Sequence, residues 1–299
     1  MKMKGRNIIP AALLLASAIL APTTVNAQEK PSKKAEQITL STRGEIGKEL
    51  SGAESPEKLP ETMYITAKST RVRKAPKTSA KEVFKLFSGM EIHPIEIKKV
   101  NEQSWVKIRV QGEDYWIFED DLDEEKAPEP KERVKGYKLV IDKEDRTITL
   151  LKADNGSWSE EKVYPMGIGG SGDTSPKQVE GDGLTPTGKY YIANINPRSN
   201  FGEHPDTGDP IPSLQIGYPN RFDAWRGLQD GVIDTRRYKE IARAIGKKGL
   251  PRQRRDLGTY IMIHGGGASD WTIGCIAVDN IDMLELSRLI KLGTPVEIK

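Results

Sequence analysis

Apolar and polar residues alternate in short runs over most of the chain beyond residue 61, which is typical of half-buried β-strands. In the C-terminal half the runs are "YKLVID" (137–142), "RTITLLKA" (146–153), "EKVYPMGIGG" (161–170) and "GKYYIANI" (188–195). β-Branched and aromatic residues dominate them, and Gly, Pro and Asp lie between them. This pattern predicts a mainly β fold.

Two segments have the helical period instead. Residues 235–245 place Tyr238, Ile241, Ala242 and Ile245 on one side, with Asp234 or Thr235 as the N-cap. Residues 280–291 follow the cap Asp279 and stop at Gly293, with their apolar side formed by Met283, Leu286, Leu289 and Ile290. The spacing predicts one helix over each segment. The fold class is therefore mainly β with a few helices.

Composition divides the chain into parts. Residues 28–61 are polar, rich in Lys, Glu and Ser, and typical of a flexible tether. Residues 123–135 alternate charges with Pro128 and Pro130, which indicates an extended linker. Between these segments lies a small block, 62–122, and after them a larger block, 136–299.

The N-terminus indicates export. Lys2, Lys4 and Arg6 precede an apolar run, 8–20, that is too short to span a bilayer, and small residues follow it up to Ala27. We interpret residues 1–27 as a signal peptide, which directs the protein to the periplasm or cell wall without stable membrane insertion. This segment holds all of the chain's excess of three positive charges, so the remainder gives no reason to expect a nucleic-acid partner.

The small block resembles a bacterial SH3-type domain. The resemblance rests on the V-R-x-x-P turn at 72–76, the W-x-K-I run at 105–108, and the Gly-x-x-Tyr-Trp-Ile segment that ends at Ile117. It covers residues 62–122 and implies a small SH3-like β-barrel. Such modules often bind the cell-wall polymer, although some are only spacers.

The larger block contains the chain's single cysteine, Cys275. An unpaired cysteine in an exported protein suggests a reactive thiol or an intermolecular bridge, and a buried, inert thiol is the plain alternative. The strand "TYIMIH" ends at His264, and "GCIAV" begins the next strand, so two strand ends can bring an imidazole and a thiol together. The backbone amides of Ile273, Gly274 and Cys275 are then candidate oxyanion donors, and Gly265 belongs to the same backbone cluster.

Two other motifs do not support a function. "GIGGSG" (167–172) matches G-x-G-x-x-G, but no helical pattern follows it, so we interpret it as a loop. The three histidines lack metal-ligand spacing, and all precede Cys275, an order that argues against papain-like peptidases. We expect no cofactor and no metal.

"IMIHGGGASDWTIGCIAVDN", together with "GDGLTPTGKYYI" and the closing "GTPVEI", resembles the YkuD family of L,D-transpeptidases. The resemblance covers roughly 136–299 and implies a β-sandwich or barrel catalytic domain. Cys275 matches the nucleophile and His264 the base, while Thr272 and Gly274 match the S/T-x-G-C signature. The segment Thr185-Pro186-x-Gly188 matches the T-P-x-G turn. The family acts on peptidoglycan stem peptides through a thioester and forms 3→3 cross-links; some relatives attach a lipoprotein amine or hydrolyse the stem.

Departures from the family pattern leave substrate binding open. Ile273 replaces a histidine and Ala277 replaces an arginine that many relatives carry. An additional arginine-rich segment, 218–258, is long enough to form a lid, and within it Arg221 and Tyr218 are our candidate substrate contacts, together with Thr272. The resemblance also implies acylation by carbapenem-type inhibitors. A hydrolase with the same nucleophile and a non-catalytic wall-binding protein remain alternatives.

Overall fold

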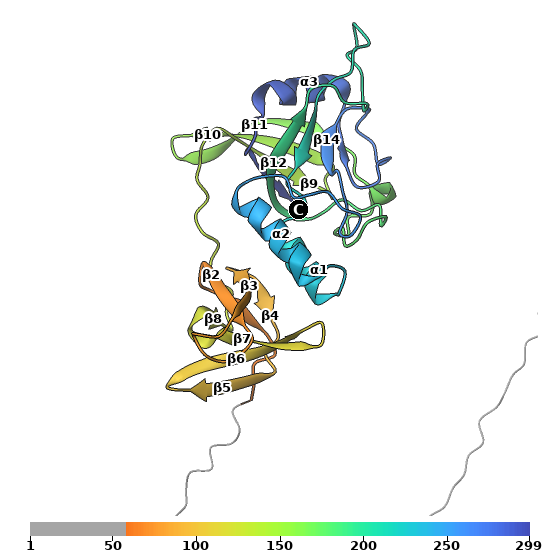
Figure 1. Ribbon diagram of the computed structural model, residues 1–299. Helices are drawn as coiled ribbons and strands as arrows, with labels where there is room; N and C mark the ends of the chain where they lie inside the picture. The colour runs from red at the N-terminus through yellow and green to blue at the C-terminus, as the bar shows by residue number, and fades with distance from the viewer. Residues whose placement is uncertain (1–57) are drawn as a thin grey trace, which may run out of the picture. The chain divides into compact units, whose positions relative to one another are not determined.

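The computed structural model describes residues 58–299, and the predicted signal peptide and nearly all of the predicted tether lie outside this range. An eight-stranded sheet forms the C-terminal part, with the strand order β11-β10-β9-β16-β12-β13-β14-β15 (Figure 1). Its strands are β9 (Tyr137–Asp142), β10 (Thr147–Asp154), β11 (Ser157–Pro165), β12 (Gly188–Asn196), β13 (Ser213–Ile216), β14 (Met262–His264), β15 (Ile276–Ala277) and β16 (Pro295–Ile298).

The core of this part lies on one face of the sheet. Alternate residues of β9 and β10, such as Leu139, Ile141 and Ile148, are fully buried there. Helix α3 (Asn280–Leu289) contributes Met283 and Leu286 to the same core. The helix begins after Asp279, as predicted, and the chain turns away at Ile290, before Gly293. The described residues are therefore mainly β with three α-helices, which confirms the predicted fold class.

The N-terminal part of the described chain is a small all-β unit of two sheets, with the orders β3-β2-β7-β6-β5 and β4-β1-β8. Its strands are β1 (Met63–Ile65), β2 (Ser69–Arg73), β3 (Glu82–Phe87), β4 (Glu91–Ile92), β5 (Glu96–Val100), β6 (Gln103–Val110), β7 (Glu113–Phe118) and β8 (Leu122–Asp123). We call this unit the small β-unit. Its resemblance to an SH3-type domain stays a sequence-based interpretation.

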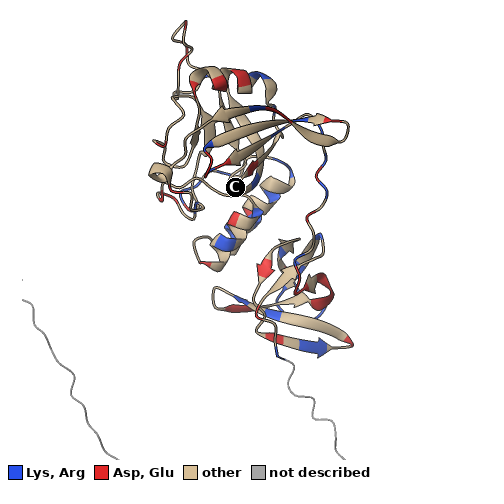
Figure 2. Cartoon of the chain, turned by 180° about the vertical axis from the view of Figure 1, so that it is seen from behind, with Lys and Arg blue, Asp and Glu red and all other residues tan. Residues whose placement is uncertain are grey.

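The arginine-rich segment between β13 and β14 forms two helices that lie side by side, α1 (Arg221–Gln229) and α2 (Thr235–Gly246) (Figure 1). The Asn220 side chain accepts hydrogen bonds from the first turn of α1, and the Asp234 side chain accepts one from the N–H of Arg237 in α2. Figure 2 shows the lysines and arginines along this helix pair. The sequence predicted α2 but not α1, because α1 buries Asp223 and Gly227 beside its apolar residues.

The apolar side chains of these helices belong to the core of the small β-unit. Trp225 and Tyr238 pack with Phe84 of β3, with ring centroids 6.2 and 5.5 Å from the Phe84 ring. The Trp225 indole donates to the Glu91 carbonyl at 2.8 Å, and the Tyr238 hydroxyl donates to the Lys85 carbonyl at 2.7 Å. The apolar residues of α1 and α2 are therefore buried against the small β-unit.

Within residues 58–299, no helix is long and apolar enough to cross a membrane.

Candidate active site

The two candidate catalytic residues lie at the edge of the large sheet where β14 and β15 run parallel. Ile263 pairs with Ile276, and His264 pairs with Ala277. Cys275 directly precedes β15, so the thiol lies at the start of the strand that pairs with the strand of the histidine. The two segments therefore lie next to each other, and the catalytic roles of Cys275 and His264 stay a prediction.

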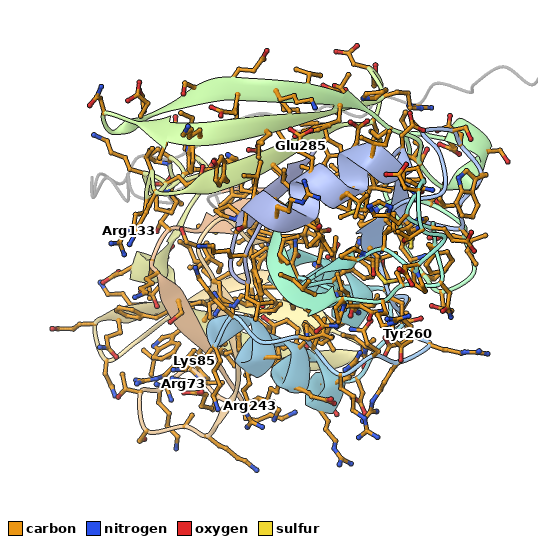
Figure 3. The ribbon with its side chains drawn as sticks, turned by 90° about the horizontal axis from the view of Figure 1, so that it is seen from above. Arg73, Lys85, Arg133, Arg243, Tyr260 and Glu285 are labelled. Atoms are coloured by element: carbon orange, nitrogen blue, oxygen red, sulfur yellow. The ribbon has the colours of Figure 1, made fainter. Side chains whose placement is uncertain are left out.

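The thiol of Cys275 is partly exposed and hydrogen-bonded to backbone. Its Sγ donates to the Tyr260 carbonyl at 3.3 Å. Burial raises the pKa of the thiol to about 11, although a backbone hydrogen bond from Met262 and the charge of Lys177 act in the opposite direction. Tyr260 itself has a positive φ of 53° and a side chain that is 59% exposed, at the surface in Figure 3.

Among the described residues, no hydrogen bond joins the Cys275 thiol to His264, and the thiol donates to the Tyr260 carbonyl instead. Catalytic hydrogen bonds often form only when substrate is bound.

The imidazole of His264 is held between two aromatic rings. Its side chain is 1% exposed, the Phe201 ring stacks on it at 4.5 Å between centroids, and the Trp271 ring meets it edge-on at 5.5 Å. Nδ1 lies 2.6 Å from the Gly265 carbonyl, which places the ring proton on Nδ1 and leaves Nε2 as an acceptor. Burial lowers the pKa of His264, so the ring is neutral at pH 7.

Two threonine hydroxyls fix the turn that carries the thiol. Thr272 Oγ1 donates to the Cys275 carbonyl at 2.7 Å and accepts from the Gly274 N–H at 3.3 Å. Thr185 Oγ1 lies 3.5 Å from the same carbonyl and accepts from the Gly169 N–H at 3.0 Å. The T-P-x-G and S/T-x-G-C segments therefore meet at the Cys275 carbonyl. Thr272, which we expected to bind substrate, uses its hydroxyl within this turn.

The glycine-rich loop, residues 167–172, was interpreted from sequence as an ordinary loop. It lies directly against residues 272–275, the turn that carries the thiol, which we call the catalytic turn. Gly169 forms a bridge with Thr272, and Gly167 forms one with Ala277. A Cβ on Gly169 would lie 2.3 Å from the Gly274 nitrogen, and one on Gly167 would lie 1.9 Å from the Ser269 carbonyl oxygen. These glycines let two backbones approach each other, a role that the motif alone did not indicate.

A carboxylate and a guanidinium hold the same loop from outside. Arg146 Nε contacts the Asp270 carboxylate at 3.0 Å, and Asp270 Oδ1 accepts from the Ile168 N–H at 2.8 Å. Arg146 also donates to the Gly172 carbonyl at 2.7 Å. Asp270 thus bonds to the glycine loop and not to His264. Sequence reasoning missed Arg146, because it lies 124 positions from Asp270.

Asn280, the first residue of α3, connects the histidine turn to the loop that carries Phe201. Its Oδ1 accepts from the Gly266 N–H at 2.8 Å, and its Nδ2 donates to the Glu203 carbonyl at 2.9 Å. A Cβ on Gly202 would lie 2.5 Å from Asn280 Oδ1. The Asn280 amide therefore fixes both the turn that orients His264 and the loop whose phenylalanine covers it.

Tyr218, Arg221 and Gly274 have contacts other than the ones that the sequence predicted. Tyr218 is 1% exposed, and its hydroxyl donates to the Leu257 carbonyl at 2.6 Å, so it is a core residue and not a substrate contact. Arg221 stacks on Phe87 of the small β-unit. The Gly265 carbonyl accepts from His264, while the Gly265 N–H stays a candidate oxyanion donor. The Gly274 N–H is bonded to Thr272. The amides of Ile273 and Cys275 stay the proposed donors.

Gly274 is required by the turn itself. Its φ is +119°, and a Cβ there would lie 2.8 Å from the Leu184 carbonyl oxygen. Within residues 58–299, no group of three or more His, Cys, Asp or Glu side chains is arranged to hold a metal ion.

The YkuD family model, described as an L,D-transpeptidase catalytic domain, matches residues 136–298. Among solved structures, Bd1075 of Bdellovibrio bacteriovorus is 20% identical, with 56% of this chain and 48% of that chain covered and a TM-score of 0.35. For the helical cell shape determining protein Pgp2 of Campylobacter jejuni the identity is 19%, the coverage 57% and 52%, and the TM-score 0.36.

An L,D-transpeptidase from Xylanimonas cellulosilytica is 16% identical, with 57% of this chain and 64% of that chain covered and a TM-score of 0.31. The chain thus spans about half the length of the first two structures. No curated protein matches the chain significantly.

Proposed function

The chain belongs to the YkuD family of L,D-transpeptidase catalytic domains, and from that premise we propose that it is a cysteine-dependent L,D-transpeptidase acting on peptidoglycan stem peptides. The proposal is supported by the parallel pairing of β14, which ends at His264, with β15, which begins directly after Cys275. A neutral imidazole with a free Nε2 is a suitable base for a thiol with a raised pKa.

In the first half-reaction, His264 Nε2 takes the proton of Cys275 as the sulfur attacks the carbonyl that precedes the terminal D-alanine. The C–S bond forms, the C–N bond breaks, and the proton passes from the imidazole to the departing D-alanine amine. The proposed oxyanion donors are the Ile273 and Cys275 amides. The product of this step is a thioester on Cys275.

In the second half-reaction, the side-chain amine of another stem attacks the thioester, His264 accepts a proton from the amine, and the thiol is released. The result is a 3→3 cross-link; a lipoprotein amine is the other acceptor class, and water gives hydrolysis. A carbapenem would acylate the same thiol through its strained lactam.

The mouth of the site is apolar. Ile273 is 87% exposed, Tyr260 59% and Trp271 47%. Because Ile273 and Ala277 replace a histidine and an arginine common in relatives, we propose that these three side chains contact the stem's backbone and methyl groups. We further propose that the protein works in the periplasm or cell wall after export and that the small β-unit binds the wall.

The test is to incubate the protein with purified disaccharide tetrapeptides and to measure product masses. A dimer that lacks one D-alanine supports transfer, and loss of D-alanine without a dimer identifies a hydrolase. Cys275→Ala protein with an unchanged melting temperature is the matched control. If wild type leaves the substrate unchanged while it still binds the wall, the proposal is wrong and the non-catalytic alternative holds.

A further inference from the structure

A cavity of about 480 Å³ lies away from the turn that carries Cys275, and three segments of the chain line it together with Lys68 and Lys189. Phe87 to Gly89 come from the end of β3 and the turn after it, residues 126–132 come from the linker, and Arg221 and Phe222 begin α1. The cavity therefore combines a side of the small β-unit with the helix pair, and it shares no residue with the site around Cys275.

Arg221 is the unusual residue of this cavity. Its guanidinium carbon lies 4.0 Å from the centroid of the Phe87 ring. Within residues 58–299, it forms no ion pair and no hydrogen bond, and its Nε is buried without an acceptor. Burial lowers the pKa of Arg221. A partly buried guanidinium without an acceptor is costly, so this position is poorly explained as a purely structural one.

The cavity's remaining charges are also unbalanced. Its two glutamates are already paired, Glu129 with Lys189 and Glu132 with Lys138. In the described part of the chain, Lys68, Lys126 and Lys131 have no carboxylate partner within ion-pair distance. The cavity thus has a net positive charge around Arg221. An anionic ligand would balance this charge.

The walls are apolar beside these charges. Phe222 is 50% exposed, and Phe87 forms the surface on which the guanidinium stacks. Gly89 has a φ of +80°, and a Cβ there would lie 3.7 Å from the Phe222 ring. A larger residue at this position would therefore narrow the cavity. The lining therefore suits a molecule with one anionic group and an apolar body.

We propose that this cavity is a second binding site for peptides of the wall, in which Arg221 holds a free carboxylate while Phe87 and Phe222 contact the peptide's aliphatic part. The guanidinium fork matches the two oxygens of a carboxylate, and a single guanidinium balances one negative charge. The site rests on the proposed function for its ligand class, but not on the chemistry at Cys275. It would hold an uncross-linked stem away from the thiol.

The experiment uses the full chain with Cys275→Ala, so that no turnover occurs. A soluble tetrapeptide stem is titrated calorimetrically into this protein, into a second form with Arg221→Met, and into a third with Arg221→Lys. We expect two sites per chain, of which Arg221→Met weakens one at least tenfold, and Arg221→Lys weakens the same site, because the ammonium lacks the fork. The same peptide with its carboxylates amidated is expected to lose that site alone.

Arg243→Met is the matched control, because Arg243 is exposed on α2 (Figure 3) and has no ion pair within the described chain. It is expected to leave both sites unchanged. Melting temperatures without ligand monitor folding, and Arg221→Met is expected to equal or exceed the parent, because it removes a guanidinium without an acceptor.

A single site that Arg221→Met does not affect would overturn the inference, as would displacement of the peptide by inorganic phosphate at equal concentration, which would make the cavity a phosphate site. A lower melting temperature for both Arg221 variants would also overturn it, because the arginine would then be structural. Failure of the proposed function is distinguishable, since it appears as a lack of Cys275 acylation by a carbapenem in the otherwise unchanged protein.

Discussion

We expect that Cys275 needs His264 to remove its thiol proton, more than a solvent-exposed cysteine would need a base. Burial raises the pKa of the thiol to about 11, whereas a free cysteine has a pKa of about 8.5. The difference corresponds to about 3 kcal/mol, and it leaves a thiolate fraction of roughly 10⁻⁴ at pH 7. The imidazole must therefore accept the proton during attack.

His264→Gln removes the base while its amide can still donate to the Gly265 carbonyl. We expect the rate of acylation by a carbapenem to fall about 10²-fold or more, as is usual for loss of a general base. The assay is intact-protein mass spectrometry over time at pH 7. Because burial lowers the pKa of His264, the imidazole stays neutral at pH values at which an exposed histidine would already be protonated. Acylation of wild type should therefore persist to lower pH than expected for a histidine with the ordinary pKa.

Alkylation by iodoacetamide provides the pH profile of the thiol in the same variant. In His264→Gln protein the rate should keep rising up to at least pH 10, because the thiolate forms only near the raised pKa of about 11. A plateau below pH 8 would refute the argument from burial. Equal acylation rates for wild type and His264→Gln would refute the assignment of the base.

Three further perturbations test the surroundings of the site. Asp270→Asn should lower the melting temperature, because Asp270 pairs with Arg146 at 3.0 Å. It should slow acylation less than tenfold, and a loss of rate as large as that of His264→Gln would require a Cys-His-Asp triad. Gly169→Ala should lower the free energy of unfolding in urea by about 1–3 kcal/mol, because its Cβ would lie 2.3 Å from the Gly274 nitrogen. Gly249→Ala, whose Cβ would make ordinary contacts, should not lower it, and similar effects of the two substitutions would contradict the close approach. Deletion of residues 62–122 should lower the melting temperature and the solubility, because it uncovers Trp225 and Tyr238; an unchanged melting transition would show that this core is dispensable.

Local patterns were sufficient for much of the fold. Alternation located β9, β10 and β12, and the helical period located α2 and α3 with their caps. Helix α1 was missed because its burial includes Asp223, whose carboxylate accepts from the Tyr190 hydroxyl at 3.1 Å and from the Asn220 N–H. A buried acid of that kind breaks the apolar pattern on which a helix prediction depends.

The candidate site was also predictable only in part from local patterns. The strand ends were enough to predict that the segments carrying His264 and Cys275 lie next to each other. The supports were not predictable in this way, because Arg146 meets Asp270 and the Gly169 loop meets the catalytic turn only through the tertiary fold. A motif gives residue identity, but such contacts depend on the register of distant strands.

The two substrate contacts that we chose from sequence show the limit of proximity in the chain. Tyr218 and Arg221 lie in one turn, yet the first is buried in the catalytic core, and the second stacks on the small β-unit. A core shared by two parts of the chain cannot be recognised from the alternation within either part. The predicted linker at 123–135 likewise gave no indication that α1 and α2 pack against the small β-unit.

Trapping the acyl-enzyme would show directly whether Cys275 is the nucleophile. The full chain is mixed with a carbapenem, digested and mapped by tandem mass spectrometry. We expect a single adduct on the peptide that contains Cys275, complete in wild type and absent in Cys275→Ala. An adduct on another residue, or folded wild-type protein that stays unmodified under conditions that acylate a known L,D-transpeptidase, would contradict it.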